Sequence, residues 1–260
     1  MRPNISRTAL SQLIAAVSCA AAIKLYYSGA SVDGLFWVLA PTAFLVEIVT
    51  GTNFTYESNA GYMSSDHSFL IAASCSGVNF LITAFLMMTI SKLWKYRQYG
   101  MNWSFIPLAL AVAYFTTIIA NTVRITTALY LRRDPQLIWI NPDELHRFEG
   151  IVIYFGFLLL LFLVTELIGS DDSGRPGRAA RLMRRSTIPL AIYYAVTLAI
   201  PLANLVVRRG PVPPDFWQHC LFVLITPILL LFPLAILGLV NGQRTMVPIG
   251  RSGWRPHTGS

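Results

Sequence analysis

Residues 69–95 read FLIAASCSGVNFLITAFLMMTISKLWK, an apolar run that holds a cysteine near its start and ends among basic residues. A helix over residues 69–90 is long enough to cross the hydrocarbon core of a bilayer, which is about 30 Å thick. Six similar runs lie at approximately 8–27, 34–50, 104–130, 146–168, 188–207 and 218–240. The sequence therefore predicts an all-α, polytopic transmembrane helical bundle of about seven spans.

The composition also indicates that the bilayer is the solvent of this chain. Only 12% of the 260 residues are charged, whereas a soluble domain carries about twice that share. The net charge is +8, and the basic residues lie in short segments between apolar runs, as in cytoplasmic loops of membrane proteins. We therefore expect no nucleic-acid binding. The three cysteines match neither a disulfide framework nor a zinc motif, and we expect no metal and no cofactor.

Basic residues predict the orientation. They cluster after residue 90, in segment 169–187 and in the C-terminal tail, and these parts should be cytoplasmic. The 51–68 loop has no Lys or Arg and should face outward, in the periplasm if the membrane is a bacterial inner membrane, as we expect. Seven spans with a cytoplasmic tail place the N-terminus outside, although Arg2 and Arg7 favour the inside.

The chain divides into three predicted parts. Residues 1–168 form a membrane domain, residues 169–187 form a basic cytoplasmic linker, and residues 188–260 form a helix pair with a basic tail.

Three polar residues are expected at one depth. At 1.5 Å per residue, each lies about 28–34 Å from the cytoplasmic end of its helix, near the outer face. They are Cys75, Arg124 and His146. Singly, each has a structural explanation as a packing thiol, a snorkelling arginine or a helix-capping histidine. Their shared depth on antiparallel helices favours a catalytic site.

These groups suit cysteine-based catalysis. A thiol is a nucleophile once deprotonated, which a helix N-terminus or a cation such as Arg124 favours. His146 would take the thiol proton and return it to a leaving amine. Arg124 would alternatively stabilise the oxyanion of a tetrahedral intermediate.

Five other polar residues are candidate supporting or substrate-binding groups: Asn79, Asn121, Glu149, Glu57 and His67. The two asparagines lie one helical turn from the candidate thiol and guanidinium and would orient them. Glu149 would orient the imidazole or pair with Arg147, Glu57 would hold a substrate backbone, and His67 is an alternative base to His146.

The same segments resemble the exosortase/archaeosortase family of membrane-embedded sorting enzymes. Ser74–Phe80 (SCSGVNF), Ala120–Arg124 (ANTVR) and His146–Gly150 (HRFEG) are similar to three family blocks: a Cys followed by a small residue and Gly, Asn-x-x-Arg, and His-x-x-x-Gly. Residues 40–62 resemble the exosortase K branch. Ser76 stands where the family usually has Ala, and the helices after residue 187 lie outside the resemblance, which covers roughly residues 35–168.

The resemblance implies a thiol peptidase or transpeptidase acting through a Cys thioester. Its partners would be exported proteins with a C-terminal sorting signal (a short motif, a transmembrane helix and a basic tail), membrane lipid and an unidentified acceptor nucleophile. By position, Cys75 is the nucleophile, Arg124 its charged partner and His146 the acid/base. Two alternatives stay open, namely a transporter or channel that uses Arg124 for an anionic solute, and a non-catalytic envelope-assembly scaffold.

Overall fold

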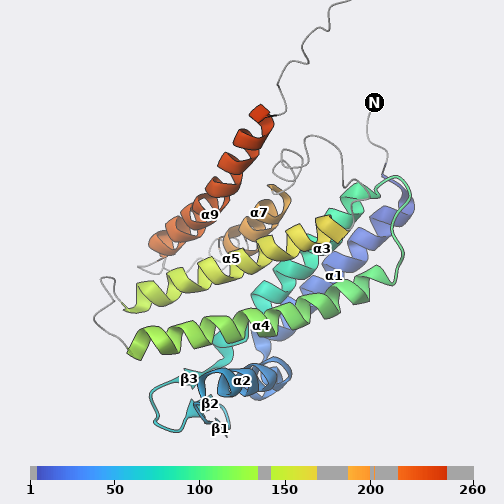
Figure 1. Ribbon diagram of the computed structural model, residues 1–260. Coiled ribbons are helices and arrows are strands. Elements are labelled where there is room, and N and C mark those ends of the chain that lie inside the picture. The colour runs from blue at the N-terminus through green and yellow to red at the C-terminus, as the bar shows by residue number, and fades with distance from the viewer. Residues whose placement is uncertain (1–4, 134–141, 169–186, 200–201, 203–215, 245–260) are drawn as a thin grey trace, which may run out of the picture.

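The computed structural model describes residues 5–133, 142–168, 187–199, 202 and 216–244 (Figure 1). Within these ranges the side chains of residues 132–133, 142–147, 167, 199, 219 and 233–244 lie outside the description. The predicted linker, except for Thr187, also lies outside the described residues. The division into three parts therefore stays a prediction.

Seven α-helices form the described part of the bundle: α1 (Arg7–Gly29), α2 (Phe36–Thr50), α3 (Val78–Lys95), α4 (Phe105–Arg133), α5 (Pro142–Ile168), α7 (Thr187–Tyr194) and α9 (Phe216–Arg244). Five helical segments among them are long and apolar enough to cross a membrane, the last of them ending at Glu166. The predicted sixth and seventh spans correspond to the shorter apolar helices Thr187–Leu198 and Phe216–Phe232. The all-α polytopic membrane bundle is confirmed, with five candidate spans in the described chain where about seven were predicted.

Helix α3 is the centre of the bundle. It packs against α1, α4, α5 and α7, and α9 covers α5. Because α3 is apolar around its circumference, it buries residues on all sides, with Ala84, Phe85 and Met87 fully enclosed. The two ends of α3 define the two ends of the molecule: the Cys75 end, where α3 begins, and the basic end, where Lys92 and Lys95 occupy its last turn.

Helix α1 starts at the basic end. The Ser6 backbone N–H donates to the Arg97 carbonyl at 2.9 Å, and the buried Gln12 side chain bonds the Met101 backbone N–H and C=O. At its other end, the Lys24 ammonium donates to Asn79 at 2.7 Å. The expectation that the N-terminus lies opposite the 92–97 loop is therefore wrong.

The error comes from α2, which packs with a small sheet that the sequence analysis did not predict. Strands β1 (Phe54–Glu57), β2 (Gly61–Ser64) and β3 (Leu70–Ile71) form an antiparallel sheet in the order β1-β2-β3. The Glu47 carboxylate accepts from the Phe54 N–H at 2.6 Å, and the Tyr56 hydroxyl donates to Asp33. Glu47, near the end of α2, and Asp33, just before its start, thus both bond to β1. Figure 1 shows α2 beside the strands. The chain from α1 to α3 starts and ends at the Cys75 end. The segment Asp33–Thr50 is a candidate span by length and composition, but it does not connect the two ends of the bundle, and counting it as a crossing places the N-terminus at the wrong end.

Candidate active site

Cys75 lies just before α3, not within the first turns of a helix as the apolar run over residues 69–90 predicted. It ends a 3-10 turn, η2 (Ala73–Cys75), and its N–H donates to the Ala72 carbonyl at 2.9 Å. Gly77 then caps α3 in the left-handed conformation, with φ of 67°. The thiol side chain is 8% exposed. Cys75 is therefore held in a tight turn at the helix entrance, with a small opening to its surroundings.

The turn is fixed against α4 by a close approach of Gly77 to Asn121. A Cβ at Gly77 would lie 2.7 Å from Asn121 Nδ2 and 2.8 Å from its Oδ1, so only glycine fits. Asn121 is fully buried and precedes Arg124 by about one turn of α4. The glycine after the cysteine and the asparagine before the arginine are thus parts of one contact.

Tyr154 of α5 joins these elements, although it lies outside the three sequence blocks that predicted the site. Its hydroxyl donates to Asn121 Oδ1 and accepts from Arg124 Nη1 at 3.3 Å. Its ring stacks on Phe80 of α3, with centroids 5.1 Å apart and planes at 17°. The Arg124 guanidinium carbon lies 5.5 Å from the centroid of the same ring. One side chain thus positions residues from both other helices of the site.

Arg124 is enclosed between α4 and α5. A Cβ at Gly150 would lie 3.1 Å from Arg124 Nε, so the glycine leaves room for the guanidinium. Arg124 also interacts electrostatically with Cys75 and with Glu149, which is buried at 7% exposure. The arginine is held by packing and hydrogen bonds near the thiol, which is a different environment from that of a snorkelling side chain.

His146 falls in α5, but its side chain lies outside the described part of the structure. His146, Gly150 and Tyr154 follow one another at intervals of four residues. This spacing places all three positions on one broad face of the helix. The contacts of Gly150 and Tyr154 show that this face is turned toward Arg124. The same spacing, His-x-x-x-Gly-x-x-x-Tyr, is the sequence signal that would have identified Tyr154.

A cavity of about 370 Å³ reaches Cys75 from the sheet side, and His67 and Ser74 also line it. His67 is exposed and has a left-handed backbone, with φ of 55°. Hydrogen bonds from the hydroxyls of Ser64 and Ser68 lower the pKa of the neighbouring Asp66 to about 2. His67, which follows this charged residue, and Cys75 thus lie on the walls of the same cavity.

The remaining predicted residues have other contacts. Asn79 is exposed and accepts from Lys24, so it ties α3 to α1. Glu57 pairs with Gly61 across the sheet and is absent from the lining of the described Cys75 cavity. The structure thus brings together Cys75, Asn121, Arg124 and Glu149, with Tyr154 added. In the described residues no group of three or more His, Cys, Asp or Glu side chains is arranged to hold a metal ion.

The fold and this site define a polytopic membrane protein with a buried cysteine and a half-buried arginine at one end of its bundle. A family model described as transmembrane exosortase (Exosortase_EpsH) matches residues 10–163, more than half of the chain, and the chain belongs to this exosortase family. The matched region contains the three sequence blocks and Tyr154. No curated protein and no solved structure matches the chain. The assignment to the K branch stays a prediction.

Proposed function

We propose that this exosortase is a cysteine peptidase or transpeptidase that cleaves the C-terminal sorting signal of exported proteins. The observation that carries the proposal is the placement of Arg124, which Tyr154 and Gly150 hold in electrostatic reach of Cys75. A fixed cation in reach of the nucleophile stabilises the oxyanion that develops during its attack. Membership of the exosortase family supports the same class of reaction.

The proposed reaction has two steps. The Cys75 thiolate attacks the scissile carbonyl, and the resulting oxyanion is stabilised by Arg124, which stays protonated throughout. The intermediate then expels the amine of the sorting signal, which receives a proton from the general acid, and a thioester remains on Cys75. Water or an acceptor amine attacks this thioester, giving the acid or a new amide and restoring the thiol.

We assign the acid/base role to His146. Its position shares the face of α5 with Gly150 and Tyr154, which contact Arg124. His67 is the competing base because it lines the cavity that reaches Cys75. Asn121 is a positioning residue, since it contacts Gly77 and accepts from Tyr154.

The Cys75 end is proposed to face the periplasm of a bacterial inner membrane. The 51–68 segment at this end has no Lys or Arg, whereas the basic end carries Lys92, Lys95 and Arg97. Basic residues favour the cytoplasmic side. This orientation gives an exported substrate access to the Cys75 cavity while its transmembrane helix stays in the bilayer.

Two experiments test the proposal. With Cys19 and Cys220 changed to Ser, Cys75 is the sole thiol of the chain, and a membrane-impermeant maleimide applied to sealed cells should label it. The labelled protein should no longer cleave a co-expressed exported protein that ends in motif, apolar helix and basic tail. Cys75→Ala should insert normally and leave this tail uncut, whereas Cys19→Ala should process it. Undiminished processing by Cys75→Ala would exclude the proposed function.

A further inference from the structure

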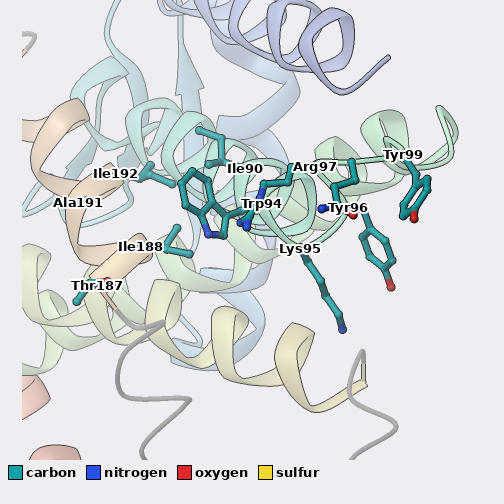
Figure 2. A pocket seen from close by; sticks show the side chains of 11 residues that line it. Ile90, Trp94, Lys95, Tyr96, Arg97, Tyr99, Thr187, Ile188, Ala191 and Ile192 are labelled. Atoms are coloured by element: carbon teal, nitrogen blue, oxygen red, sulfur yellow. The ribbon is translucent and has the colours of Figure 1, made fainter. Parts of the chain in front are cut away.

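A second cavity, of about 790 Å³, lies at the basic end, between the end of α3 and the start of α7 (Figure 2). One wall is apolar and includes Ile90 of α3 and Ile188 and Ile192 of α7. Figure 2 shows the Trp94 ring between these isoleucines and Arg97. This cavity is separate from the Cys75 site, which lies at the other end of α3, about 27 Å away along the helix axis.

The polar part of this cavity is cationic. Lys95 and Arg97 line it, and none of its described lining residues is an Asp or Glu. The Arg97 guanidinium carbon lies 5.3 Å from the Trp94 ring centroid. Its Nε is buried and has no hydrogen-bond partner in the described part of the chain. The half-buried Arg97 guanidinium and the absence of carboxylates from the described lining favour an anionic ligand in this cavity.

The surroundings distinguish between anions. Trp94 and Tyr99 are largely exposed, and aromatic residues of this kind mark the interface between lipid headgroups and hydrocarbon. A small soluble anion would use the guanidinium but leave the isoleucine wall in water. An anionic phospholipid has a phosphodiester for Arg97 and an acyl chain for this wall, and it is present in the adjacent leaflet.

We propose that this cavity binds the phosphodiester headgroup of an anionic phospholipid, with Arg97 as the principal ligand. The Trp94 ring and the isoleucines of α3 and α7 cover the upper part of an acyl chain. The lipid then joins α7, which follows the predicted linker, to the central helix of the bundle. The inference goes beyond the peptidase reaction and does not depend on it.

The test measures lipid binding to the purified full-length protein by native mass spectrometry. Phosphatidylglycerol and phosphatidylcholine with identical acyl chains are titrated in a neutral detergent. We expect one saturable phosphatidylglycerol site and weaker binding of phosphatidylcholine. Arg97→Gln should lower the phosphatidylglycerol affinity about fivefold, the effect of one basic residue near a membrane surface. Lys92→Gln is the matched control, because Lys92 lies in the last turn of α3, five residues before Arg97, with its ammonium over the Phe105 ring, and does not line the cavity.

A second variant guards against misfolding of Arg97→Gln. Ala191→Phe fills the cavity from α7 and leaves both cations in place, and it should weaken phosphatidylglycerol binding as well. Equal binding of the two lipids by the wild type would overturn the proposal, as would equal losses in Lys92→Gln and Arg97→Gln or unchanged binding in Ala191→Phe. Displacement of the lipid by millimolar inorganic phosphate would identify a free-phosphate site and would also overturn it.

Discussion

Gly77 and Asn121 approach each other so closely that a Cβ on the glycine would stand 2.7 Å from the asparagine amide nitrogen. The contact sets the start of α3 against α4, and Cys75 is two residues from one partner while Arg124 is three from the other. The distance between the thiol and the guanidinium therefore depends on a position that only glycine fills.

Gly77→Ala should destabilise the protein and stop processing. The left-handed backbone costs an alanine about 1–2 kcal/mol, and the clash with Asn121 adds about 1–3 kcal/mol. Gly51→Ala separates the two effects, because Gly51 has the same φ of 67° with nothing within 4 Å of its Cβ position. Thermal unfolding in detergent should show the smaller loss for Gly51→Ala. Equal losses of stability in the two variants would mean that Asn121 moves away from the added methyl group at little cost.

Gly150→Ala should impair catalysis more than stability. The added methyl group would lie 3.1 Å from Arg124 Nε and displace the guanidinium. The contact requires a shift of only a few tenths of an ångström, and a misplacement of about 1 Å lowers rates by about 100-fold, so we expect a loss of several-fold. Gly156→Ala in the same helix meets no atom within 4 Å, so it should stabilise α5 by about 0.5–1 kcal/mol and process normally. The cleavage rate of the tailed substrate is the measurement, and a fully active Gly150→Ala would contradict the assigned place of Arg124.

Tyr154→Phe should lower processing while the protein stays folded. The variant keeps the ring stacked on Phe80 but loses the hydroxyl that bonds Asn121 and Arg124. Depriving buried polar groups of a partner costs about 1–3 kcal/mol, part of which appears as a misplaced guanidinium. Tyr114→Phe is the control, since that hydroxyl donates to the Trp37 carbonyl at 2.7 Å, away from the site. Similar activities of Tyr154→Phe and Tyr114→Phe would show that the Tyr154 hydroxyl has no role in the site.

Ser76→Ala should raise the unfolding temperature. Ser76 is fully buried, and its hydroxyl has no hydrogen-bond partner in the described part of the structure. Removing such a group relieves a desolvation cost of about 1 kcal/mol. Ser64→Ala should have the opposite effect, because the buried Ser64 hydroxyl donates to Asp66 and accepts from the Phe69 N–H. A lower unfolding temperature for Ser76→Ala would reveal a partner for this hydroxyl.

His146→Ala and His67→Ala should separate the two candidate bases. Loss of a general acid/base lowers a rate by about 10²–10⁴-fold. We expect this loss for His146→Ala, and less than about a tenth of it for His67→Ala. Single-turnover cleavage is the measurement, with Cys75 labelling as a check that the site is intact. The reverse order of effects would transfer the role to His67.

The sequence predicted the parts of the fold that hydrophobicity encodes. Apolar runs identified the spanning helices, and helical rise placed Cys75 and Arg124 at one end. The N-terminus was placed at the wrong end of the bundle because two polar contacts hold α2 to the sheet. These contacts join Glu47 to Phe54 and Tyr56 to Asp33, and a hydropathy pattern does not reveal them.

The site was predicted in part for a related reason. Gly77 separates the 3-10 turn of Cys75 from α3, and its close contact is with a residue on another helix, which no local pattern reveals. Tyr154 sits in an apolar run, where a tyrosine usually serves packing, and its hydrogen bonds cross between α4 and α5. Asn79 has the expected spacing but faces Lys24 of α1. Tertiary partners, rather than spacing alone, thus decide which polar residues join the site.

The hydrogen bonds between Gln12 and the Met101 backbone have a consequence for biogenesis. The two residues are 89 positions apart, so the ribosome makes Gln12 long before its partner exists. A lone amide is poorly tolerated in hydrocarbon, and α1 alone cannot satisfy it. The place of α1 is therefore completed only after α3 and the loop that follows it have left the translocation machinery.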